Sequence, residues 1–150
     1  MATEAGSRAN GQTGKRDLTM QMERAIQIYA LIQFVVIGLS HVFQPRAWVT
    51  FFIMLRDKGE AGVFVVAFMS LLFGSLVVSF HNVWTDLPIV LTLIGWAQVM
   101  KGFIYFLFPA FPLRRGLRIP SYERAWVFIP GGLMFLVLAG LLGYHLWTTA

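Results

Sequence analysis

The chain has 150 residues, of which 57% are hydrophobic and 13% charged, and its mean hydropathy is +0.68. Soluble domains carry about twice this share of charge, so the composition excludes an ordinary water-exposed surface and indicates a membrane protein. Cysteine is absent, which excludes disulfides, Cys-ligated iron–sulfur clusters and thiol catalysis. The formal net charge is +5, but the basic residues flank apolar segments as membrane-edge charges do, so no nucleic-acid partner is expected.

The chain begins with a small, polar segment, and residues 1–20 are predicted to form a mobile tail that becomes helical only where it enters the membrane domain of residues 21–150. Four apolar segments follow, each near the ~20 residues that cross ~30 Å of hydrocarbon. Short links and helices that satisfy their own backbone predict an all-α fold, a four-transmembrane-helix bundle. The predicted spans are about 25–43, 61–80, 87–108 and 125–147.

The link between the first two spans, "QPRAWVTFFIMLRDKGEAG", has its own periodicity. Pro45 should stop the first helix or open a new one. Apolar residues recur after it at spacings of three and four, over a length too short to span a bilayer. This pattern predicts an interfacial amphipathic helix lying in the headgroup plane, and the alternative is an extension of the first helix.

Basic residues are distributed unequally between the two sides of the predicted bundle. The side with the two short basic links carries Arg46, Arg56, Lys58, Arg114, Arg115, Arg118 and Arg124, and the other side carries Arg8, Lys15, Arg16 and Arg24. The positive-inside rule therefore predicts cytoplasmic links, which face anionic lipid, and periplasmic termini.

The third span contains the candidate partner- or ligand-facing residues. Gly95, Gln98, Gly102 and Tyr105 are predicted to share one face, with Lys101 on its flank. Lys101 lies about two-thirds of the way across, and the four apolar segments contain no acidic residue. Its side chain either snorkels to the headgroups or pairs with an external group, such as a lipid phosphate, a neighbouring carboxylate or an anionic ligand. Gln33, in the first span, is a further candidate, and the alternative is that these residues are packing seams within the bundle.

The three histidines are the candidate ligands for a metal or haem. His81, Asp86 and His145 lie near one membrane face and could form such a site, although no ligand spacing supports it. The alternative is that the histidines solvate helix ends. In the same regions, Trp48, Trp84 and Trp147 are predicted to lie in an interfacial aromatic belt. We therefore predict no cofactor, with haem or metal binding as the alternative.

Five phrases, "GLSHVFQPRAW", "GEAGVF", "LLFG", "FHNVW" and "GWAQVMKGFIYFLFP", resemble those of small four-span bacterial membrane proteins without an assigned function. The resemblance covers about residues 37–109, implies the bacterial inner membrane, and carries no site residues.

The expected function is that of a non-catalytic accessory or structural subunit that packs with other subunits in a larger membrane complex. An energy-transducing complex, photosynthetic or respiratory, is the candidate assembly. The 14 phenylalanines suit packing against lipid or other helices. The alternative function is the binding of a haem, a metal or another small-molecule ligand by a small membrane protein.

Overall fold

The computed structural model describes residues 2–115 and 122–149, with side chains for residues 12–114 and 122–149. Throughout these ranges the chain is all-α, with no strand. The elements are α1 (Ala2–Phe43), α2 (Pro45–Asp57), α3 (Glu60–Phe80), α4 (Ile89–Leu107), α5 (Ala110–Arg115), the 3₁₀ helix η1 (Tyr122–Val127) and α6 (Phe128–Thr148).

Four helices in the described part of the chain are long and apolar enough to cross a membrane. They are Gln12–Phe43, Glu60–Phe80, Ile89–Leu107 and Tyr122–Thr148, so the predicted all-α membrane fold with four spans is confirmed. The N-terminal segment differs from the expected tail, because it is helical from Ala2 onward and continuous with the first span. Its alanines, its arginines and Gln12 favour helix, and no proline precedes Pro45 to stop it.

Helix α2 is a separate helix and not an extension of α1. The chain leaves helical geometry at Gln44, and Pro45 then opens α2, where its missing N–H is not needed. Two contacts fix the corner between the helices. The indole N–H of Trp48 donates to Ser40 Oγ at 2.9 Å, and the Trp48 ring stacks on His41 with 4.0 Å between ring centroids.

The corner between α2 and α3 depends on two glycines. Gly59 has a φ of +58°, in the left-handed region that favours glycine. Gly62 lies so close to α2 that an added Cβ would collide with the carbonyl of Leu55. The start of α3 is therefore packed directly onto the end of α2.

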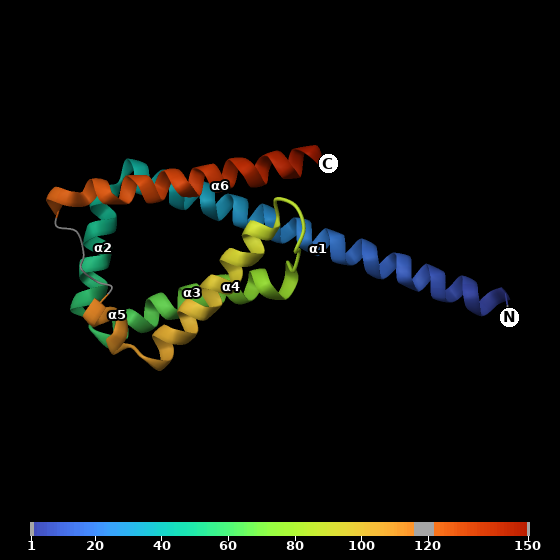
Figure 1. The fold of residues 1–150 in the computed structure, drawn as a ribbon, viewed down its shortest axis with the longest axis horizontal. Helices are drawn as coiled ribbons and strands as arrows, with labels where there is room; N and C mark the ends of the chain where they lie inside the picture. Colours follow the sequence, from blue (N-terminus) through green and yellow to red (C-terminus); the bar gives the residue numbers. More distant parts are fainter. Residues whose placement is uncertain (1, 116–121, 150) are drawn as a thin grey trace.

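The four long helices form two pairs, α1 with α6 and α3 with α4 (Figure 1). Glycines lie at the close approaches within each pair. An added Cβ on Gly38 would meet the carbonyl of Gly132 at 3.0 Å, and one on Gly74 would meet the carbonyl of Gly95 at 2.7 Å. These small residues let the helix backbones approach and the remaining side chains interlock.

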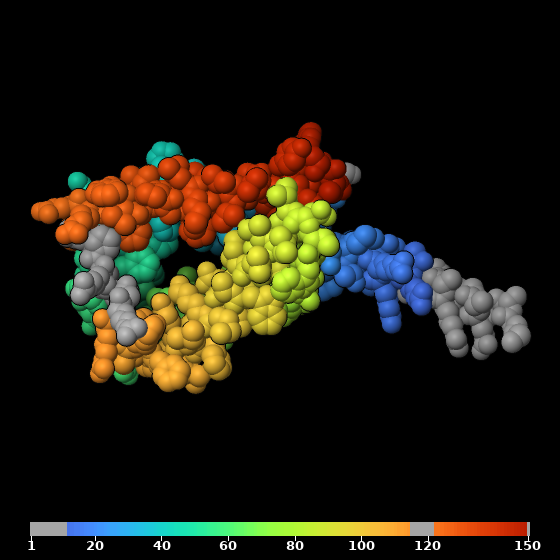
Figure 2. Space-filling model, viewed as in Figure 1, coloured from blue at the N-terminus to red at the C-terminus, as the bar shows by residue number. Residues whose placement is uncertain are grey.

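The two pairs join at the end of the molecule opposite α2. A shared core of residues from α1, α3, α4 and α6 lies there, composed of Ala30, Phe34, Val77, Leu91, Ala139 and Leu142. Toward α2 the pairs diverge, and α2 crosses between them (Figure 1). Figure 2 shows the surface hollowed between α4 and α6 on this side. The predicted bundle is therefore closed at one end and open toward the other.

Candidate functional site

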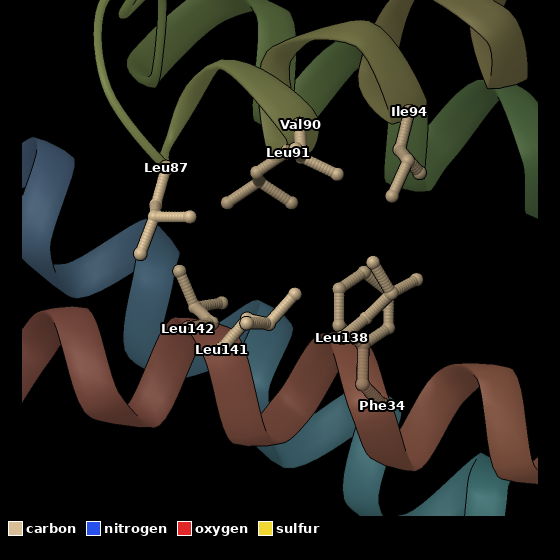
Figure 3. A pocket seen from close by; sticks show the side chains of 8 residues that line it. All are labelled: Phe34, Leu87, Val90, Leu91, Ile94, Leu138, Leu141 and Leu142. Atoms are coloured by element: carbon tan, nitrogen blue, oxygen red, sulfur yellow. The ribbon is translucent and has the colours of Figure 1, made fainter.

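One face of the third span, here called the α4 stripe, changes character along its length. It consists of Leu91, Ile94, Gln98, Lys101 and Tyr105, which recur at spacings of three and four residues. The apolar half approaches Phe34 of α1 and Leu138 of α6 at the closed end, around a cavity of only about 20 Å³ (Figure 3). By helical periodicity, the polar half continues on the same face toward the hollow.

Lys101 lines a cavity of about 140 Å³ beneath α2. Its ammonium nitrogen lies 5.6 Å from the centroid of the Tyr105 ring, which places it toward the α2 end of the molecule. Within residues 12–114 and 122–149, the ion pair found is the exposed Arg56–Asp57 contact, and no carboxylate pairs with Lys101. The cavity is lined by Phe52, Leu55, Gly62, Val63, Val66, Lys101, Tyr105 and Pro112.

Gln98, one turn before Lys101, has a buried side-chain oxygen with no hydrogen-bond partner among the described residues. The sequence predicted that Gly95 and Gly102 share one face of the helix with Gln98, but the two glycines lie on a different face. Added Cβ atoms on these glycines would meet Val77 and Leu71 of α3, so the glycines form the seam with α3. Gln98, Lys101 and Tyr105 form the neighbouring face.

Across the hollow, α6 presents a glycine. Gly131 lies seven residues before Leu138, so both share the α6 face that approaches α4 at the closed end. In the described part of the chain, no heavy atom other than those of its chain neighbours and its own helix backbone lies within 4 Å of the place where a Cβ of Gly131 would be. Gln33, the fourth candidate from the sequence, is half-buried on α1 and does not line the Lys101 cavity.

His81 belongs to a buried hydrogen-bond network that joins three helices at the closed end. Its Nε2 lies 3.0 Å from Nε2 of Gln27 on α1, and its Nδ1 lies 3.2 Å from Oγ1 of Thr92 on α4. Thr92 Oγ1 donates in turn to the carbonyl of Val83 at 2.8 Å. His81 and Thr92 are fully buried and Gln27 is nearly so.

The network has one consistent direction of donation. An amide N–H of Gln27 donates to Nε2 of His81, so the ring carries its proton on Nδ1 and donates it to Thr92. This arrangement requires a neutral imidazole. Burial lowers the pKa of His81, which lies just past the end of the α3 span, and the nearby His145 acts in the same direction.

The structure does not gather His81, Asp86 and His145 into a group of three metal ligands, and haem or metal binding stays an untested alternative. Both ring nitrogens of His81 have hydrogen-bond partners, and Asp86 is exposed in a turn with a φ of +54°. Over the described residues, no group of three His, Cys, Asp or Glu side chains could hold a metal ion. The expectation that His81 solvates a helix end is wrong, because Gln27 and Thr92 enclose it.

The sequence did not identify Gln27 and Thr92 as hydrogen-bond partners of His81. Each is a polar residue in an otherwise apolar stretch, which was the available signal, but their partners come from other helices. Of the interfacial candidates, Trp48 closes the α1–α2 corner. Trp84 and Trp147 are 53% and 84% exposed near the ends of spans at the closed end.

Comparisons with protein-family models, with curated proteins and with solved structures find no match to this chain.

Proposed function

We propose that this chain is a non-catalytic accessory subunit of a larger complex in the bacterial inner membrane. The observation that carries the proposal is one exposed glycine, Gly140 on α6. It lies between Val137 and Tyr144, which are 62% and 65% exposed on the same face. Apart from its chain neighbours and the backbone of its own helix, no described heavy atom lies within 4 Å of the place where a Cβ of Gly140 would be.

The other glycines of the spans support a helix contact at this face. Gly38 and Gly132 form the seam between α1 and α6, and Gly74 and Gly95 form the seam between α3 and α4. Small residues in membrane helices allow close approach of a second helix, whereas lipid chains do not require them. No helix among the described residues packs on Gly140, so its partner helix would come from another subunit.

Exchanging Gly140 for leucine tests this proposal. The added side chain points into open space, so the isolated chain keeps its fold, but a partner helix can no longer approach. Gly131→Leu is the matched control, because the same exchange is made in the same helix and also into open space. We expect wild type and Gly131→Leu to purify in mild detergent with a partner subunit or a second copy, and Gly140→Leu to lose it. A wild type that is a lone monomer, or a Gly140→Leu variant that keeps its partner, would refute the proposal.

The proposed orientation has the α2 end in the cytoplasm. Arg46, Arg56, Lys58, Arg114 and Arg124 belong to the elements and turn at this end, and such residues favour the cytoplasmic side. The beginning of α1 and the end of α6 lie at the opposite end (Figure 1). A fluorescent reporter that matures only in the cytoplasm should therefore stay dark when fused after α6, and fluorescence would reverse this orientation.

A further inference from the structure

A positive charge without a counter-charge among the described residues lies in the cavity beneath α2, on the α4 face that by helical periodicity continues toward the hollow. Lys101 lies within the α4 span, its side chain is half-buried, and no described carboxylate pairs with it. An ammonium group at such a position is costly in a bilayer unless another group neutralises it. The cavity walls around it, such as Phe52 and Val63, are apolar and supply no anion. The described residues supply no such group, so a group from outside them is the candidate.

The neighbouring side chains define what that group looks like. Lys101 offers N–H donors, and the Tyr105 hydroxyl on the next turn offers another. An acid group satisfies these two donors.

The shape of the hollow suits a hydrocarbon chain attached to that acid. Past Gln98 the α4 stripe is apolar, with Ile94 and Leu91 leading to the closed end opposite Leu138. Gly131 leaves the α6 wall without a side chain at the open end. Figure 2 shows that the hollow reaches the surface between α4 and α6, from which a lipid can enter sideways.

We propose that the hollow binds one anionic amphiphile, whose acid group pairs with Lys101 and whose acyl chain lies between α4 and α6. The acid is a phosphate or a carboxylate, because both present oxygens to an ammonium group. The bilayer itself supplies both kinds of molecule, as anionic phospholipid or as free fatty acid. This site lies on the inner face of α6, whereas Gly140 lies on its outer face.

Native mass spectrometry of the purified full chain tests the proposal with three probes: phosphatidylglycerol, phosphatidylcholine and oleate. The variants are Lys101→Met, which removes the charge and keeps the chain length, and Gly131→Leu, which fills the hollow and keeps the charge. Gly140→Leu is the control, with the same exchange on the outer face of the same helix. Loss of a hydrogen bond to a charged group predicts binding at least about tenfold weaker in Lys101→Met.

We expect wild type and Gly140→Leu to hold one anionic molecule and to bind phosphatidylcholine at least about tenfold more weakly. Gly131→Leu should lose that molecule although Lys101 is intact. Preference for phosphatidylglycerol identifies a phospholipid as the ligand, and preference for oleate identifies a fatty acid. Equal retention of phosphatidylglycerol and phosphatidylcholine, without oleate binding, would overturn the proposal, as would unchanged anion binding in Lys101→Met or Gly131→Leu. Because Gly140→Leu breaks only the subunit contact, the two proposals can fail separately.

Discussion

Replacing Thr92 by valine removes one hydroxyl from the His81 network and keeps the volume of the side chain. In the native structure this hydroxyl accepts from Nδ1 of His81 at 3.2 Å and donates to the carbonyl of Val83 at 2.8 Å. The exchange leaves a buried N–H without an acceptor and a carbonyl without its donor. An unsatisfied buried group costs about 1–3 kcal/mol, so the two together predict a loss of about 2–6 kcal/mol in the free energy of unfolding.

The assay is unfolding by sodium dodecyl sulfate in mixed micelles, followed by far-ultraviolet circular dichroism. Thr148→Val is the matched control, because it is the same exchange at the end of a span. The hydroxyl of Thr148 bonds to the carbonyls of Tyr144 and His145, but it is exposed, so we expect a change below about 0.5 kcal/mol. If Thr92→Val were no more destabilising than Thr148→Val, the network would not hold the closed end together.

Two further predictions concern pH and the α2–α3 corner. Because burial lowers the pKa of His81 below its ordinary 6.5, the unfolded chain binds this proton more readily than the folded chain. The stability that comes from the neutral ring is therefore complete above pH 6.5 and is lost as the pH falls below that value. The unfolding temperature should accordingly fall between pH 8 and pH 5, and His81→Gln should make this fall smaller. Gly62→Ala should lower the free energy of unfolding by about 1–3 kcal/mol, because the added methyl group overpacks against the carbonyl of Leu55. Gly131→Ala adds the same group in open space and should leave this free energy unchanged or raise it. Equal effects of the two variants in the micelle assay would contradict the packing argument.

The spans were predictable because hydropathy and length are properties of each segment alone. The separate helix α2 was predictable for a similar reason, since Pro45 restricts its own backbone. The helical N-terminal segment was not expected, because small polar residues suggested a tail although none of them stops a helix. The local pattern therefore predicted the apolar spans, but it did not predict the residue at which α1 begins.

The pairing of helices could not be predicted from the sequence. Lys101, Gln98 and Tyr105 were identified by their polarity, but the sequence did not separate their face from that of Gly95 and Gly102. These faces are less than a quarter turn apart at their nearest residues, and only the position of α3 distinguishes them. The burial of His81 depends likewise on side chains from two other helices, which no spacing within α3 reveals.

The length of α1 has a mechanical consequence. A helix of 42 residues is about 63 Å long, roughly twice the ~30 Å of hydrocarbon that it crosses. About half of α1 therefore extends beyond the closed end as a rod (Figure 1). Because the rod and the span are one continuous helix, axial rotation of the span within the membrane would turn the distant beginning of α1 with it. A molecule bound to the beginning of α1 would therefore be rotated when the membrane-spanning half of α1 rotates.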